Sequence, residues 1–161
     1  NASSGENYGL EIEGSFQATD NLLLTGSAGY LHTEINDFVA QSGLDQDGRD
    51  QAQAPKYQYA FTARYNFTPA LYASIGVEGK DDYYFSDSHN SQAPSTNLVN
   101  ASFGYESDNW SINAWARNLF DEDVPTRGFE FGNDPLDGYT THTYTQLGEP
   151  MVAGVTFIYE L

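Results

Sequence analysis

The stretch KYQYAFTARYNF, residues 56–67, decides the fold. Every second side chain in it is aromatic or aliphatic, and the side chains between them are mostly polar. The apolar set is Tyr57, Tyr59, Phe61, Ala63, Tyr65 and Phe67, and the polar set is Lys56, Gln58, Thr62, Arg64 and Asn66. Successive side chains of a β-strand point to opposite faces of the sheet. The stretch therefore predicts a strand with one apolar face and one polar face.

The same two-residue period recurs along the chain, and little helical periodicity competes with it. It predicts seven strands, in residues 7–18, 22–32, 56–67, 71–85, 97–106, 110–118 and 151–161. A further hairpin is predicted between residues 129–131 and 139–145. No linker interrupts the pattern, so residues 1–161 read as one architectural unit.

The connections between these strands alternate in length. Tight turns made of turn-forming residues lie at 19–21, 68–70 and 107–109. Long connections cover residues 36–55, residues 86–95 and the stretch after 118. In an antiparallel meander, this alternation places every short turn at one end of the sheet and every long loop at the other.

Composition excludes several classes of protein. The net charge is −17, and only six Lys and Arg are present to neutralise phosphates, which argues against nucleic acid as a partner. The absence of cysteine rules out a disulfide framework and a thiolate metal site. No run approaches the roughly 18 consecutive apolar residues of a spanning helix.

Alternation alone does not decide which face meets water. A soluble sandwich buries its apolar face, whereas an outer-membrane barrel turns that face to lipid. The strands are long enough for a tilted span of about 9–11 residues, the polar face is rich in Ser, Gly, Asn and Gln, and the loops are long at one end only. Aromatic residues also gather near strand ends, as in an interfacial girdle: Tyr30, Tyr57, Tyr83, Phe67, Tyr105, Trp110 and Tyr159.

The predicted fold is therefore all-β, an antiparallel up-and-down transmembrane β-barrel segment of about seven strands. Single-chain bacterial barrels have an even number of strands, from eight upward. An open sheet would leave two edges unpaired. We therefore expect the chain to be part of a larger barrel whose earlier strands lie upstream.

Residues 118–161 resemble the carboxy-terminal end of a TonB-dependent outer-membrane receptor. In that family the penultimate strand ends in Asn-Leu-x-Asp, matched here by NLFD at 118–121. A long outer loop follows, and a Gly-Glu-Pro sequence, here 148–150, leads into the last strand. That strand usually finishes on Phe, whereas this chain has Leu161. The strand layout upstream matches as well, so the resemblance covers essentially the whole chain.

The resemblance implies the last seven strands of a barrel of about 22 strands, with a plug domain in its lumen. It implies an outer membrane of a Gram-negative bacterium, and active import of an iron–siderophore complex, cobalamin or an oligosaccharide. The implied partners are lipid, the rest of the barrel, the plug, and TonB through a part of the protein outside this sequence. Lipid contact is expected for the face of Met151, Ala153, Val155, Phe157 and Tyr159.

The candidate site residues are charges expected to face the lumen. Arg64, Glu78 and Arg117 are the weak substrate-binding candidates, and they could instead pair with the plug. Glu11, Glu13 and Lys80 share the same expected face. No nucleophile, base and orienting group can be assembled, so we expect no catalytic residues, no enzyme and no cofactor.

One acidic loop is a weak candidate for calcium. LDQDGRDQ places Asp45, Asp47 and Asp50 around a glycine. An EF-hand loop needs a Glu six residues after that glycine, where this chain has Ala54, so the full pattern fails. His32, His89 and His142 lie far apart in the sequence and have no metal-ligand spacing.

Two other readings remain open from the sequence. One is a small self-contained outer-membrane barrel with a structural or adhesin role, which would need an eighth strand from residues 124–131. The other is a soluble, secreted β-sandwich that binds calcium or sugar.

Overall fold

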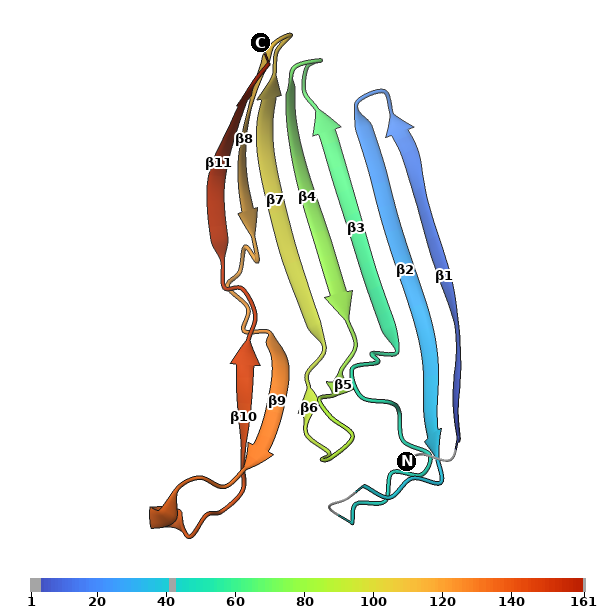
Figure 1. Ribbon diagram of the computed structural model, residues 1–161. Helices are drawn as coiled ribbons and strands as arrows, with labels where there is room; N and C mark the ends of the chain where they lie inside the picture. Colours follow the sequence, from blue (N-terminus) through green and yellow to red (C-terminus); the bar gives the residue numbers. More distant parts are fainter. Residues whose placement is uncertain (1–3, 41–42, 161) are drawn as a thin grey trace.

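A single seven-stranded antiparallel sheet forms the body of the protein (Figure 1). The computed structural model describes residues 4–40 and 43–160, so Leu161 lies outside the described residues. The main strands are β1 (Ser4–Thr19), β2 (Leu22–Asn36), β3 (Tyr57–Asn66), β4 (Leu71–Lys80), β7 (Thr96–Glu106), β8 (Trp110–Arg117) and β11 (Val152–Tyr159). The predicted seven-stranded meander is confirmed.

Two small sheets lie at the other end from the tight turns (Figure 1). One pairs β5 (Tyr83–Tyr84) with β6 (Gln92–Ala93), and the other pairs β9 (Pro125–Phe131) with β10 (His142–Leu147). The 3-10 helix η1 (Pro135–Asp137) forms the tip of the β9–β10 hairpin. Within the described residues, no helix is long and apolar enough to cross a membrane.

The tight turns follow from side-chain chemistry. Thr19 and Thr68 each accept a hydrogen bond at Oγ1 from the backbone N–H three residues later, at 3.1 and 3.0 Å. Such a bond satisfies a backbone donor that has no strand partner inside a turn. All three short turns lie at one end of the sheet, and the first (37–40 and 43–56), second (81–95) and third (118–151) loops lie at the other.

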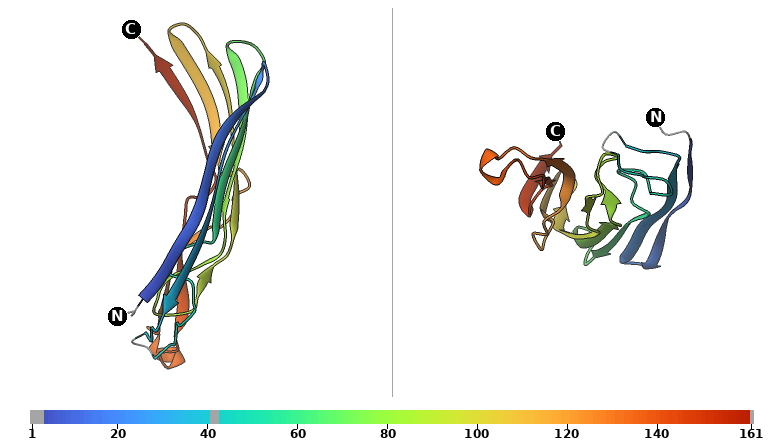
Figure 2. Two further views of the ribbon diagram at one scale, coloured as in Figure 1. Left: turned by 90° about the vertical axis from the view of Figure 1, so that its right-hand side faces the viewer. Right: turned by 90° about the horizontal axis from the view of Figure 1, so that it is seen from below.

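The sheet is curved into an arc and does not close (Figure 2). Its strand order is β1-β2-β3-β4-β7-β8-β11, so β1 and β11 each have one neighbour within the described part of the chain. The outer edges of these two strands carry backbone groups that the sheet itself does not pair.

One face of the sheet is apolar and uncovered. A register row across six strands of this face runs Leu22, Tyr65, Ala73, Phe103, Ala114 and Val155. Large side chains on it are highly exposed: Leu10 is 72% exposed, Ile75 55% and Phe157 62%. A β-sandwich would cover such a face with a second sheet, and among the described residues no second layer does so. The sandwich reading is therefore wrong.

Two predictions at the loop end need correction. The strand predicted for residues 71–85 stops at Lys80, and Tyr83 lies in β5 with only 5% of its surface exposed. Its ring packs edge-on against Phe85, so Tyr83 belongs to a small core rather than to an interfacial girdle. Residues 125–131 pair with β10 and supply no eighth strand to the main sheet.

A polar bracket fixes the approach to the last strand. Asn118 follows β8 with a left-handed backbone, φ 48°, and is 3% exposed. Its side chain donates to the carbonyls of Glu122 (2.9 Å) and Glu149 (3.2 Å) and accepts from the Glu122 N–H (2.9 Å). Asp121 accepts from the N–H of Met151 at 2.7 Å. The Asn-Leu-x-Asp motif thus holds the two ends of the third loop together.

We predict that Asn118→Ala destabilises the folded protein by about 1–3 kcal/mol. The change leaves two partly buried carbonyls and one N–H without their partner, and alanine disfavours a positive φ. The measurement is the urea midpoint of the whole protein in detergent micelles. Asn109→Ala, in a turn at the opposite end, removes a side chain that makes no hydrogen bond with described residues and is the matched control. Equal urea midpoints for the two variants would contradict the claim that the Asn118 hydrogen bonds stabilise the folded protein.

Candidate functional site

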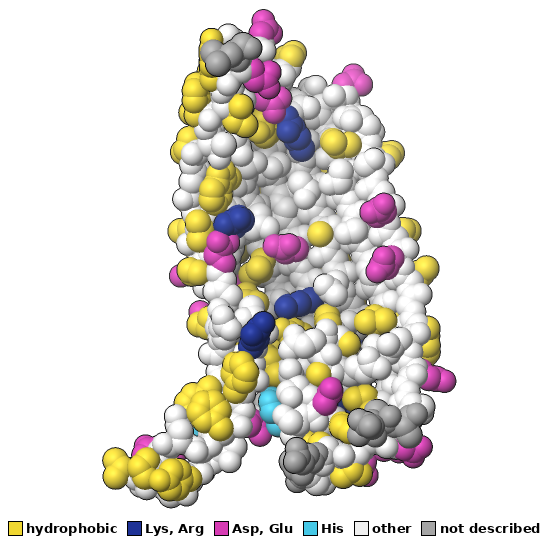
Figure 3. Space-filling model, in the orientation of Figure 1, with side chains coloured by type: hydrophobic (Ala, Val, Ile, Leu, Met, Phe, Trp, Pro, Cys, Tyr) yellow, Lys and Arg dark blue, Asp and Glu magenta, His cyan; other side chains and the backbone are white. Residues whose placement is uncertain are grey.

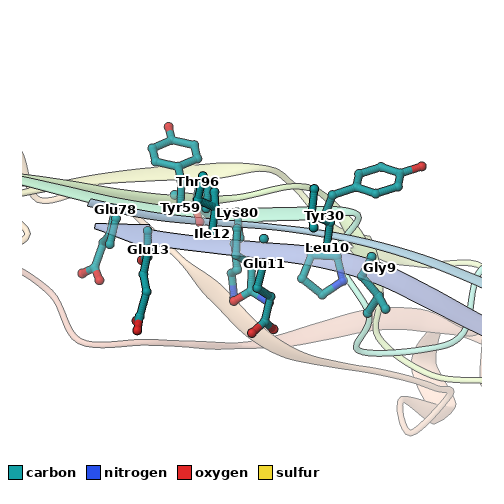
Figure 4. A pocket seen from close by; sticks show the side chains of 18 of the residues that line it. Gly9, Leu10, Glu11, Ile12, Glu13, Tyr30, Tyr59, Glu78, Lys80 and Thr96 are labelled. Carbon is teal, nitrogen blue, oxygen red and sulfur yellow. The ribbon is translucent and has the colours of Figure 1, made fainter. Parts of the chain in front are cut away.

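The concave face of the sheet forms an open polar trough. The groove has a volume of about 1210 Å³ and is lined mainly by β1, β2, β3 and β4. Charged side chains of both signs lie within the hollowed face of the molecule (Figure 3). In Figure 4, Glu11, Glu13 and Glu78 point to one side of the sheet, whereas Tyr30 and Tyr59 point to the other. The predicted separation into a polar and an apolar face is confirmed.

The three trough carboxylates have no basic partner. Glu11 and Glu13 lie on β1, and Glu78 lies on β4 in the same register row as Glu13. Glu78 accepts a hydrogen bond from the Asn100 side chain at 3.1 Å. None of the three forms an ion pair with a residue that the structure describes. The trough therefore presents negative charge to whatever occupies it.

The two candidate arginines lie in the trough face but apart from Glu78. Arg64 pairs with Glu106 at 3.1 Å, and its guanidinium carbon lies 3.6 Å from the centroid of the Tyr72 ring. Its register partner on β4 is Ser74, four residues before Glu78. The structure therefore does not assemble these candidates into one cluster.

Arg117 sits at the end of β8, where the third loop begins. It pairs with Glu149 at 2.7 Å, next to the carbonyl that Asn118 holds. This ion pair ties the end of β8 to the approach to β11. Lys80 lies 4.6 Å from the centre of the Tyr83 ring and forms no ion pair with a described residue.

Aromatic rings lie flat on the floor of the trough. Tyr72 covers Gly104 of β7, and Trp115 covers Gly154 of β11. A Cβ atom at Gly104 would overlap the Tyr72 ring, and one at Gly154 would come within 2.7 Å of the Trp115 ring. The Trp115 indole N–H also donates to Thr156 Oγ1 at 3.1 Å. Both glycines are required by close approach of a ring to the backbone.

The apolar face carries aromatic residues near both ends of its strands. Near the tight turns, ring centroids are separated by 5.0 Å (Tyr65–Phe67), 6.5 Å (Phe67–Phe103), 5.2 Å (Tyr105–Trp110) and 6.2 Å (Trp110–Phe157). Tyr8, Tyr30 and Tyr57 lie on the same face near the loops and are 60%, 53% and 43% exposed. This arrangement is typical of the two girdles of a membrane barrel.

The three carboxylates of the calcium candidate have separate hydrogen-bonding roles. Asp45 accepts from the N–H of Asp47 at 3.1 Å, and Asp47 accepts from the N–H of Asp37 at 2.9 Å. Asp50 pairs with Lys56 at 3.0 Å. Within residues 4–40 and 43–160, no group of three or more His, Cys, Asp or Glu could hold a metal ion. The structure does not bring these carboxylates together as a ligand set.

Charges at the junction of β3 and β4 with the loops alter two pKa values. The hydrogen bond to Asp50 and the negative charge of its carboxylate raise the pKa of Lys56. Desolvation raises the pKa of Asp82, and the hydrogen bond and charge of neighbouring Asp81 act in the same direction. Lys56 thus stays charged beside Asp50, and Asp82 holds its proton more readily than an isolated aspartate.

The histidines remain separate, as their spacing predicts. His32 lies beside Tyr8 with ring centroids 4.6 Å apart, and His142 Nε2 contacts Asp137 at 2.6 Å. His89 is 8% exposed, with Nδ1 3.8 Å from Glu130. Sequence reasoning missed Arg49, whose largely covered side chain crosses between the first and second loops. No spacing rule could have found it, because its partners lie about 40 residues away.

Comparisons with known proteins support the same fold. A family model described as TonB dependent receptor-like, beta-barrel matches residues 1–119. The siderophore receptor PiuA from Acinetobacter baumannii has a TM-score of 0.73 at 20% identity, over 96% of this chain and 21% of that protein. The ferric yersiniabactin uptake receptor FyuA from Yersinia pestis has a TM-score of 0.76 at 17% identity, over 96% and 23%.

The closed form of the ferric-catecholate import receptor Fiu from Escherichia coli K12 has a TM-score of 0.67 at 20% identity, over 95% of this chain and 20% of that protein. The chain thus spans about a fifth of the length of the receptors it matches. At these identities the structural likeness concerns the fold, and the family follows from the model match. The chain belongs to the TonB-dependent receptor-like β-barrel family.

Proposed function

We propose that this chain is the carboxy-terminal part of an outer-membrane active importer. The remaining strands and a lumenal plug come from the rest of the protein, and TonB supplies the energy coupling. The imported molecule is a scarce ligand, of the iron–siderophore, cobalamin or oligosaccharide class. The chain supplies a section of the barrel wall and its outer loops rather than catalytic groups.

The observation that carries this proposal is the open, two-faced sheet. Its apolar face is exposed along the whole main sheet, its polar face is hollow, and two strand edges lack a second neighbour among the described residues. A lipid bilayer solvates the first face, a water-filled or plugged lumen suits the second, and further strands pair the edges. The similar structures bear names of siderophore and ferric-siderophore receptors, which favours the iron–siderophore class among the three.

The trough carboxylates support a role for the concave wall in holding a lumenal domain. Glu11, Glu13 and Glu78 are unpaired with bases in the described chain, and charges facing a protein-filled lumen are stabilised by opposite charges on its occupant. Arg64 and Arg117 already have carboxylate partners, at 3.1 and 2.7 Å. We propose that the carboxylates meet the plug and that the arginines shape the wall and the ligand path.

The first test is the mass and location of the native protein. Isolated outer membranes are separated by denaturing gel, and bands containing peptides of this chain are identified by mass spectrometry. We expect a band several times heavier than 17.8 kDa. A native species of 17.8 kDa would contradict the proposal. Uptake of radioactive iron from a panel of ferric siderophores, with and without TonB, then tests the ligand class and the energy source.

The second test places a charge on each face of the same region. Ile75→Arg puts a guanidinium at mid-strand on the apolar face, which costs about 2–4 kcal/mol at the bilayer midplane. Thr62→Arg is the matched control, because Thr62 lies on the concave face opposite Gly76. We expect Ile75→Arg to lower the amount of folded, heat-modifiable protein in the outer membrane several-fold, and Thr62→Arg to change it little. The reverse order would show that lipid contacts the other face.

A further inference from the structure

The first and second loops meet at one arginine, Arg49, whose side chain is largely covered. The backbone of Arg49 is fixed to the main sheet, because its carbonyl accepts from the N–H of Ile35 at 2.9 Å, near the end of β2. Its own N–H donates to the Gln46 carbonyl at 3.1 Å. Its side chain is only 9% exposed and leaves the first loop to enter the second.

The guanidinium of Arg49 binds four acceptors in a short segment of the second loop. Nη1 donates to the carbonyl of His89 (2.9 Å) and to Asn90 Oδ1 (3.0 Å). Nη2 donates to the carbonyl of Ser86 (3.1 Å) and to Asp87 Oδ1 (3.4 Å). The guanidinium carbon also lies 4.3 Å from the centroid of the Tyr84 ring. A planar fork with five donors suits such a set, whereas a lysine ammonium offers three donors at a point.

Further hydrogen bonds near Arg49 join the same two loops. Gln53 donates from its backbone to the Tyr84 carbonyl and from its side chain to the Phe85 carbonyl, both at 2.9 Å. The N–H of Ala52 donates to Asp87 Oδ1 at 3.2 Å, and Gln46 Nε2 donates to the Asp87 carbonyl. Gln46 is 1% exposed, whereas the Asp87 side chain is 55% exposed, so the junction is buried on the side of the first loop and open to solvent at Asp87.

The second loop in turn holds the third. Ser91 Oγ contacts a carboxylate oxygen of Glu130 and lies 3.2 Å from Thr143 Oγ1, so it touches both strands of the β9–β10 hairpin. The Phe85 ring lies so close to Gly128 that a Cβ atom there would overlap it. The segment Ser86–Ser91 is therefore hydrogen-bonded to Arg49 on one side and to the β9–β10 hairpin on the other.

We propose that the three long loops form a single body and that Arg49 is the positioning residue that assembles it. Arg49 is anchored to β2 through its backbone and fixes the second loop through its side chain. The second loop in turn fixes the β9–β10 hairpin of the third loop. The described parts of the three loops then fluctuate together rather than independently. This inference goes beyond the proposed import function and does not depend on the identity of the ligand.

The test is hydrogen–deuterium exchange with mass spectrometry on the full-length protein in detergent micelles. We expect Arg49→Ala to raise amide exchange about ten-fold or more in peptides from both 43–56 and 81–93, because four charge-assisted hydrogen bonds are lost and two carbonyls lose a donor. Exchange in β9 and β10 should rise as well, by a smaller factor. Strands β3 and β4 should keep the exchange of the unaltered protein.

Two further variants make the result specific. Arg49→Lys keeps the charge but not the fork, so it should restore little of the protection of the second loop. Arg127→Ala removes an arginine from the third loop whose side chain makes no hydrogen bond or ion pair with described residues, and it should leave all three loops unchanged. A rise confined to the first loop, or full rescue by lysine, would overturn the proposal. Because exchange needs no transported ligand, this outcome is independent of the uptake and membrane tests.

Discussion

Backbone hydrogen bonding is the constraint on which the rest of this structure depends. A strand satisfies its N–H and C=O groups only through neighbours on both sides, and lipid offers no substitute for a missing neighbour. The five inner strands of the main sheet have two neighbours, whereas β1 and β11 have one each among the described residues. The same sheet exposes an apolar face that water solvates poorly. Continuation of the sheet and a bilayer on its apolar side would resolve both conditions together.

The sequence predicts the strands well because each one must present a single face to a single solvent. The apolar period in residues 56–67 gives one face of β3, on which Tyr57, Phe61 and Tyr65 are exposed, and two of the three tight turns fall where a Thr side chain bonds the backbone. The same period misled the prediction past Lys80. Tyr83 continues the alternation, but its hydroxyl points to the carbonyls of Pro125 and Thr126 at 3.4 Å and its ring is covered by the loops. A two-residue period in the sequence does not predict where a strand ends or which loops cover the residues that follow it.

The outer loops were much less predictable, because their contacts have no period. Arg49 is one of two basic residues in an acidic loop, and its sequence neighbours give no sign of its partners on the second loop. The resemblance drew attention to residues 118–121, but not to their role. Only the structure shows that Asn118 and Asp121 hold the approach to β11. The candidates Arg64, Glu78 and Arg117 share the predicted face. Their partners, which are Glu106, Asn100 and Glu149 respectively, are set by the tertiary structure and could not be read from the sequence.

The glycines beneath Tyr72 and Trp115 have a consequence for the dimensions of the wall. Because Gly104 and Gly154 have no side chain, these large rings lie along the backbone and not across the hollow. A Cβ atom at either position would lie too close to the ring above it, so the ring would have to move away from the backbone. The depth at which these two rings lie against the wall thus depends on two missing methyl groups.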